Sequence, residues 1–152
     1  MAMAEVEMIA ARRCWMGVLA KARPERLAEC VARLGEEPAI HWLRPPEVGA
    51  VMVRGRMGGT GAPFNLGEMT VTRCALRLPD GTVGHGHVQG RDRRHARQAA
   101  LVDALMQGAR APEVEATVIA PLAEEAAAAR RLRAEKAAAT KVEFFTMVRG
   151  ED

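Results

Sequence analysis

The chain has 152 residues, of which 49% are hydrophobic but only 3% aromatic, and its formal net charge is +3. This length predicts a single domain, residues 1–152, with enough apolar material for a core, while the small charge argues against general nucleic-acid binding. The three cysteines are widely spaced and form no CxxC motif, which favours free thiols over a disulfide framework or a zinc site.

Residues 1–36 are predicted to form a helical hairpin. Apolar residues recur at approximately helical spacing over positions 5–20. Pro24 suits the first turn of a second helix, where its missing N–H is not needed, and Gly35 suits the end of that helix. Charges interrupt the first apolar run, so neither a signal peptide nor a membrane-spanning segment is expected. We therefore expect a cytoplasmic protein that does not bind a membrane.

Residues 38–90 are predicted to form a mainly antiparallel sheet of about four strands. The apolar or alternating runs that carry this expectation are 39–43, 48–56, 69–78 and 82–89. The segment Pro79-Asp80-Gly81 joins the last two runs as a tight turn, because Gly81 can supply a positive φ. Alternation along 69–78 places Thr72, Cys74 and Leu76 on one face of the sheet.

A glycine-rich segment, RMGGTGAPFNLGE at 56–68, lies between the second and third runs. Gly58, Gly59 and Gly61 permit positive φ and the close approach of another group, and successive backbone N–H groups in such a loop can bind an anion. The spacing matches neither a P-loop nor a dinucleotide-binding fingerprint. Two interpretations stay open, a flexible connection between strands or, together with Arg56, a phosphate site.

Two histidines, His85 and His87, stand two residues apart and so share one face of the last strand. Such a pair holds a metal ion when a third ligand lies opposite. The hairpin register forces no acidic residue into that position. A solvated pair is therefore preferred, and no metal site is predicted.

Residues 92–107 are predicted to form a helix with Asp92 as its N-cap. Arginines crowd its first turns, at the helix end that disfavours cations. An anion or an acidic partner would neutralise them, and a solvated basic face is equally open. Arg91 and Arg94 are accordingly candidates for contact with phosphate or with another protein.

The C-terminal part, 121–152, is predicted to be an alanine-rich helix and a docking tail. Alternation over 114–119 favours a further short strand before Pro121, which begins a helix that continues to about Thr140. This helix has few large apolar residues and is expected to lie on the outside or to project into a partner. Leaving the apolar tail in water is unfavourable, so it should pair with the sheet or dock on another chain. The candidate docking residues are Phe144, Phe145, Met147 and Arg149.

The sequence contains no recognisable catalytic constellation. GxSxG and HExxH motifs are absent, and the chain has no tyrosine. No catalytic residue and no cofactor are therefore predicted. The residues alone indicate an α+β domain that binds a phosphorylated ligand or an acidic partner.

Three stretches together resemble the PhnG family, the G subunits of the bacterial carbon–phosphorus lyase system. They are RMGGTG at 56–61, the run from Thr72 to Asp92 with its continuation to Gln107, and FFTMVRG at 144–150. The resemblance implies membership of a core complex with two copies each of subunits G, H, I and J. It also implies a role, with subunits H, I and L, in forming α-D-ribose 1-methylphosphonate 5-triphosphate from ATP and methylphosphonate.

The resemblance further implies an accessory chain, because the nucleosidase-like chemistry belongs to subunit I and the radical chemistry to subunit J and its iron–sulfur cluster. This chain has no cysteine triad for such a cluster. Two hypotheses follow. In the first, the chain is a structural subunit with subunit I as its expected direct partner. In the second, Arg56, the glycine loop at Gly58–Gly61, Arg91 and Arg94 contact the triphosphate or the phosphonate directly. A third, independent RNA binding, is weaker.

Overall fold

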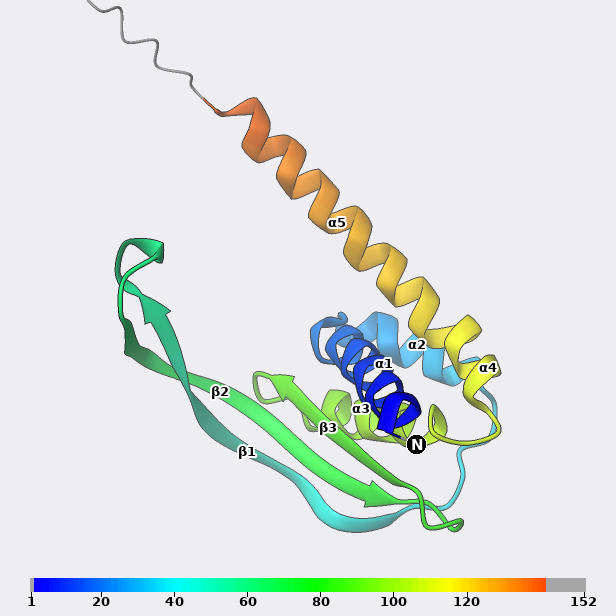
Figure 1. The fold of residues 1–152 in the computed structure, drawn as a ribbon. Helices are drawn as coiled ribbons and strands as arrows, with labels where there is room; N and C mark the ends of the chain where they lie inside the picture. Colours follow the sequence, from blue (N-terminus) through cyan, green and yellow to red (C-terminus); the bar gives the residue numbers. More distant parts are fainter. Residues whose placement is uncertain (1, 142–152) are drawn as a thin grey trace, which may run out of the picture.

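The computed structural model describes residues 2–141 and confirms the predicted α+β class (Figure 1). The elements in chain order are α1 (Ala2–Lys21), α2 (Pro24–Ala32), β1 (His41–Arg56), the 3-10 turn η1 (Met57–Gly59), β2 (Pro63–Arg77), β3 (Val83–Gln89), α3 (Arg93–Leu105), α4 (Ala111–Val114), the π-helical turn η2 (Glu115–Ile119) and α5 (Ala120–Ala139). None of the helices in this part of the chain is long and apolar enough to cross a membrane.

The sheet has three antiparallel strands in the order β1-β2-β3 within the described residues. The expectation of about four strands was wrong because residues 41–43 of the first run and the whole of the run 48–56 belong to one strand, β1. Pro45 and Pro46 interrupt the pairing, and register shifts fall between Trp42 and Glu47. Proline donates no backbone hydrogen bond, and β1 tolerates two of them because it is an edge strand with bulges.

The predicted turn between β2 and β3 is confirmed. Leu78 N donates to Thr82 O at 2.9 Å, and Gly81 has φ +91°. The Asp80 carboxylate accepts a hydrogen bond from Thr82 N at 2.9 Å, and this bond lowers the pKa of Asp80. The predicted alternation along β2 also holds, since Thr72, Cys74 and Leu76 are buried.

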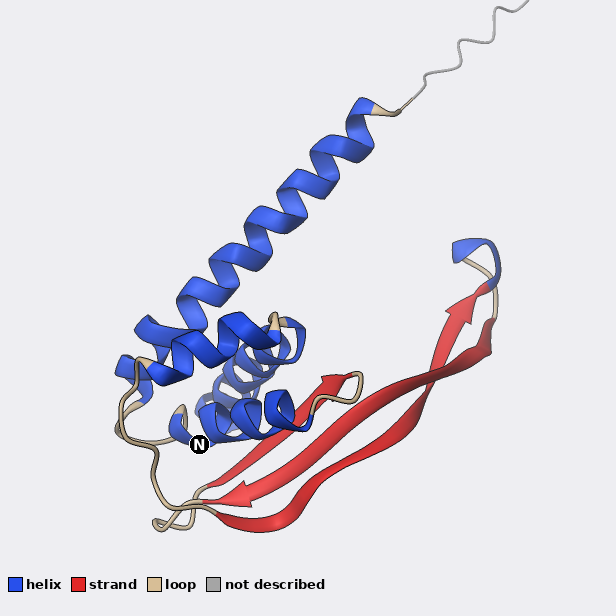
Figure 2. Cartoon of the chain, turned by 180° about the vertical axis from the view of Figure 1, so that it is seen from behind, coloured by secondary structure: helices blue, strands red, loops and turns tan. Residues whose placement is uncertain are grey.

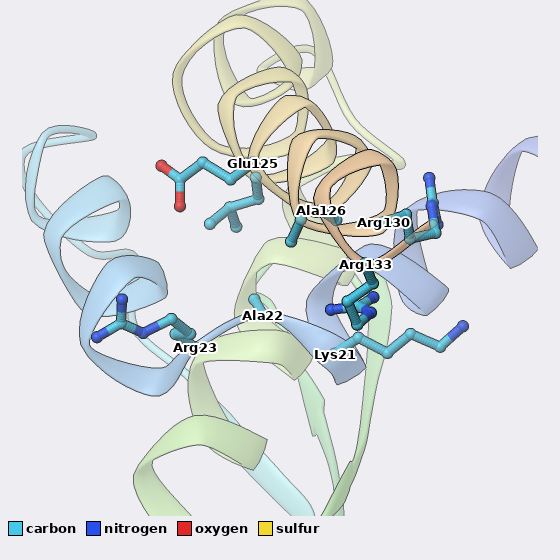
Figure 3. Close-up of a pocket in the computed structure, with 9 residues that line it drawn as sticks. Lys21, Ala22, Arg23, Glu125, Ala126, Arg130 and Arg133 are labelled. Carbon is cyan, nitrogen blue, oxygen red and sulfur yellow. The ribbon is translucent and has the colours of Figure 1, made fainter. Parts of the chain in front are cut away.

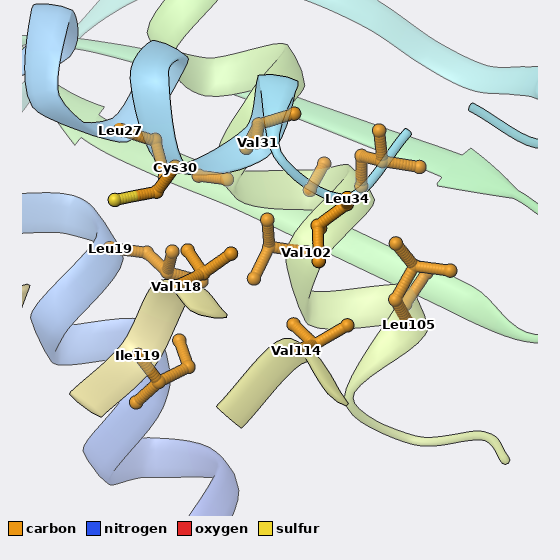
Figure 4. Close-up of a cluster of buried hydrophobic side chains, with 14 of the residues drawn as sticks. Leu19, Leu27, Cys30, Val31, Leu34, Val102, Leu105, Val114, Val118 and Ile119 are labelled. Carbon is orange, nitrogen blue, oxygen red and sulfur yellow. The ribbon is translucent and has the colours of Figure 1, made fainter. Parts of the chain in front are cut away.

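One face of the sheet is covered by α3, and α2 packs on the outer side of α3 (Figure 2). The core lies between these layers and extends to α1 and to the turns before α5 (Figure 4). Its largest fully buried side chains include Leu19, Leu27, Leu76, Leu101 and Val118. The N-cap prediction for α3 is confirmed, because the Asp92 carboxylate accepts a hydrogen bond from His95 N at 2.9 Å.

The strand predicted over residues 114–119 was wrong, because this segment is helical and runs directly into α5. The buried residues are Val114, Val118, Ile119 and Leu122, whose spacing of three or four residues places them on one helical face. Pro121 has no N–H to donate to the carbonyl four residues earlier. A π-helical turn over Glu115–Ile119 accommodates that loss. The alternation of apolar residues over 114–119 therefore did not indicate a strand. It arose because smaller residues lie between the side chains that contact the core.

Candidate functional site

The β1–β2 hairpin projects beyond the rest of the sheet as a two-stranded arm, residues 51–69 (Figure 1). Strand β3 pairs with β2 only between Val71 and Arg77, whereas β2 continues to Pro63. The eight further residues span roughly 26 Å at the rise of a β-strand. The arm therefore stands outside the packed body of the domain.

The arm carries apolar side chains that nothing in the described chain covers. Those with more than two-fifths of their surface exposed are Met52, Met57, Phe64 and Leu66. A two-stranded hairpin is only marginally stable in water without further packing, and its unpaired edges invite pairing with another chain. These features are typical of a surface that another protein covers.

The glycine-rich segment forms the tip of the arm. Gly58 and Gly59 have φ of +60° and +81°, so the expectation of positive φ is confirmed at both. Gly61 N donates to Met57 O at 2.8 Å, and Arg56 Nη1 donates to Gly61 O at 3.1 Å. A Cβ atom at Gly61 would lie 2.6 Å from Met57 O. The tip is thus a tight turn whose closure requires glycine.

The arginines at the start of α3 lie apart from this tip. Arg91 and Arg94 are exposed beside the end of β3, and the arm carries the glycines away from that point. The structure therefore does not bring the two predicted sets of phosphate residues together within one chain. Arg97 is engaged already, since its Nη2 lies 2.5 Å from Glu37 Oε2 and this bond raises the pKa of Arg97.

The histidines of β3 are exposed next to α1. Within residues 2–141, no group of three potential metal-ligating side chains gathers around them or elsewhere. His95 of α3 is buried, and its Nε2 lies 2.8 Å from Leu19 O. This histidine contributes to the packing of α1 against α3.

Sequence reasoning missed a buried polar cluster around Asp103 of α3, which is fully buried. Arg12 donates Nε and Nη2 to its two carboxylate oxygens at 3.1 and 2.7 Å. Trp15 Nε1 and His85 N donate to the same carboxylate at 2.8 and 2.9 Å. The cluster ties α1, α3 and β3 together. No local signal could reveal it, because Arg12 and Asp103 are 91 residues apart.

The three cysteines are free, as predicted. Cys14 is exposed, whereas Cys30 and Cys74 are buried. Burial raises the pKa of Cys74 to about 11, and its Sγ donates to Ala96 O at 3.2 Å. A thiol of this kind is unreactive at neutral pH, so Cys74 has a packing role.

Two helices add to the uncovered surface. Helix α5 extends away from the body on the same side as the arm (Figures 1 and 2), and Leu122 is the one buried residue of its length. This confirms the expected outer position of the helix. The first turns of α1 expose Met3, Val6 and Ile9. The predicted docking residues Phe144, Phe145, Met147 and Arg149 lie outside the described residues.

Comparison with known proteins relates the chain to a described family and to a curated relative. Residues 10–150 match the protein family described as phosphonate metabolism protein PhnG. The chain is also similar to alpha-D-ribose 1-methylphosphonate 5-triphosphate synthase subunit PhnG of Rhizobium meliloti (strain 1021). The two are 46% identical over 144 residues, which cover 95% of this chain and 92% of that relative. The family match includes the tip of the arm and most of the tail.

Proposed function

The chain belongs to the PhnG family of phosphonate metabolism proteins, and from this premise we propose that it is a non-catalytic subunit of a cytoplasmic α-D-ribose 1-methylphosphonate 5-triphosphate synthase. Its role is to assemble with the H, I and J subunits of the carbon–phosphorus lyase core, with I as the direct partner. Together with H, I and L it supports the reaction of ATP with methylphosphonate.

The observation that carries this proposal is the uncovered apolar surface. The arm exposes Leu66 over 66% of its area and Met57 over 76%, and the first turns of α1 expose Val6 over 65%. Side chains of this size are stabilised by about 1.5–3 kcal/mol each on full burial. Permanent complexes bury large apolar interfaces of this kind. A subunit that is incomplete without its partners accounts for all these surfaces at once.

Co-expression with the H, I and J subunits tests the proposal. The full-length chain is expected to co-elute with them in size-exclusion chromatography with light scattering. Removal of residues 142–152 is expected to weaken that co-elution, because the apolar tail is proposed to dock on a partner. The change Leu66→Asp should weaken binding by about 30-fold or more, since it removes roughly 2 kcal/mol of apolar burial and adds a charge.

Leu43→Asp is the matched control, because Leu43 lies on β1 before the arm and is 49% exposed. It makes the same chemical change at a similar exposure and should leave co-elution nearly intact. Equal losses from Leu66→Asp and Leu43→Asp would argue against a specific role for the arm. A full-length chain that remains a monomer beside the other subunits would overturn the proposed function.

A second candidate function is direct contact with phosphate or triphosphate through Arg56, Gly58, Gly59, Gly61, Arg91 and Arg94. It is favoured by one observation, namely that Arg91 and Arg94 are exposed and form no ion pair within the described residues. Because the two sets are separated in the chain, each would have to reach substrate from its own side of the assembly.

Arg91→Ala separates the two candidates. Direct contact predicts an intact complex in which KM for ATP or methylphosphonate rises, or turnover falls, by about tenfold, because an arginine–phosphate hydrogen bond is lost. A purely structural role predicts either unchanged kinetics or loss of assembly. Arg77→Ala, at an exposed arginine near the opposite end of the sheet, is the control and should change neither property.

A further inference from the structure

A basic cavity of about 450 Å³ lies between α5 and the junction of α1 with α2 (Figure 3). Lys21 and Arg23 lie on one side of it and Arg130 and Arg133 of α5 on the other. The one acidic residue of the lining is Glu125. We propose that this cavity binds a small ligand with a chain of phosphoryl groups, a di- or triphosphate, through these four cations.

The charge of the lining is unbalanced. Four cations and one carboxylate leave a surplus of three positive charges, as large as the net charge of the entire chain, +3. The carboxylate is also engaged elsewhere, because Arg26 Nε and Nη2 donate to Glu125 Oε1 at 3.0 and 2.5 Å. An anion in the cavity would relieve the repulsion among cations that no acidic side chain balances.

The pKa of Glu125 is lowered, first by the hydrogen bond from Arg26 and also by the charge of Arg23. Glu125 therefore stays ionised at neutral pH. Arg130 and Arg133 form no ion pair with any described residue, so their guanidinium groups are available to a ligand. Guanidinium groups bind phosphate oxygens in a bidentate manner.

The shape of the cavity favours a small ligand over a flat protein surface. Its lining includes three small side chains, Ala22, Ala126 and Ala129, which leave space that larger residues would fill. Its volume falls within the range of about 300–1,000 Å³ that is usual for ligand pockets. The lining extends along α5 from Leu122 to Arg133, roughly 16 Å of helix. This length suits a chain of phosphoryl groups better than a single phosphate.

The inference that the ligand is an anion depends only on the charge and shape of the cavity. The choice of a triphosphate among phosphate compounds rests on the proposed function, in which ATP is a substrate and the product is a triphosphate. The cavity is distinct from the glycine-rich tip and from Arg91 and Arg94, which lie on other elements.

Isothermal titration of the full chain at about 0.15 M salt tests the inference, with tripolyphosphate, ATP, inorganic phosphate and an oligoglutamate peptide as separate probes. Tripolyphosphate and ATP are expected to bind with saturation, and inorganic phosphate much more weakly. Arg133→Ala and Lys21→Ala should each weaken tripolyphosphate binding by about tenfold, the loss of one charge-assisted hydrogen bond. Ala129→Leu should weaken it too, because the new side chain fills space without changing the charge.

Arg131→Ala is the matched control. Arg131 is exposed on the same helix but faces a different depression, beside Glu124 and Ala128, so its loss changes the net charge equally and should leave binding within about twofold. If Arg131→Ala and Arg133→Ala weaken tripolyphosphate binding equally, binding depends only on the overall positive charge of the chain, and the inference is overturned. Tighter binding of oligoglutamate than of tripolyphosphate would overturn it in favour of an acidic segment of a partner.

The outcomes are separable from those of the assembly experiment. If the chain binds tripolyphosphate but fails to assemble with the other subunits, the inference about the cavity is supported and the proposed function is refuted. Assembly of a chain that binds none of the phosphate probes would support the proposed function and overturn the inference about the cavity.

Discussion

Asp103→Ala is expected to lower the free energy of unfolding by about 3–5 kcal/mol, because removing this fully buried carboxylate leaves the part-buried Arg12 and two further donors without their acceptor. The side chain of Asp103 is fully buried, and four hydrogen bonds converge on it from Arg12, Trp15 and the backbone of His85. Domains of this size are stable by about 5–15 kcal/mol. The variant should therefore lose a large fraction of the stability of the fold.

Urea unfolding followed by circular dichroism measures this effect. Arg12→Lys should lower the free energy of unfolding less than Asp103→Ala does, since lysine keeps the charge but cannot form the bidentate hydrogen bonds of the guanidinium group. Asp80→Ala is the control, because Asp80 is exposed in a turn and accepts a hydrogen bond from one backbone N–H. An unfolding midpoint for Asp103→Ala that equals that of Asp80→Ala would refute the role assigned to the cluster.

Gly86→Ala is expected to destabilise the fold by at least about 3 kcal/mol, at or beyond the upper end of the range for overpacking. A Cβ atom at Gly86 would lie 2.0 Å from Ala96 O, and one at Gly84 would lie 2.0 Å from Ala100 O. Both obstacles are backbone atoms of α3, which cannot turn aside as a flexible side chain would. To accommodate the methyl group, α3 would have to move away from β3.

Such a movement would also stretch the bond from His85 N to Asp103, so the two predictions concern one interface. Gly49→Ala is the control for Gly86→Ala. Gly49 lies in β1, and a Cβ atom there would meet nothing within 4 Å. Its replacement should be neutral or slightly stabilising, because alanine restricts the unfolded chain. Thermal unfolding of Gly86→Ala and Gly49→Ala tests this prediction. Similar midpoints for the two variants would contradict the argument that α3 packs too closely on β3 for a side chain at Gly86.

The elements that could be predicted from the sequence depend on residues close together in the chain. Asp92 caps α3 through a bond to a residue three positions later, and Gly81 closes a turn between adjacent strands. Alternation along β2 identified its buried face correctly. Each of these signals follows from local backbone geometry, which few residues suffice to determine.

The errors arose where one local pattern suits two structures. Pro45 and Pro46 suggested the end of a strand, but both lie within β1, an edge strand with bulges. Val114 and Val118 read as alternating residues, but they lie on one helical face that packs against the core. In both places tertiary packing selected between alternatives that local preference leaves nearly equal.

By itself, then, the sequence determined the α+β class, the turns, the cap of α3 and the resemblance to the family. These features depend only on neighbouring residues and on the order of motifs along the chain. Only the tertiary structure decided that Arg12 meets Asp103, that Gly84 and Gly86 admit α3 against β3, and that Lys21 and Arg133 face one cavity. Those contacts join residues far apart in the chain. Their formation depends on how the apolar faces of whole elements pack together, and no short segment contains that information.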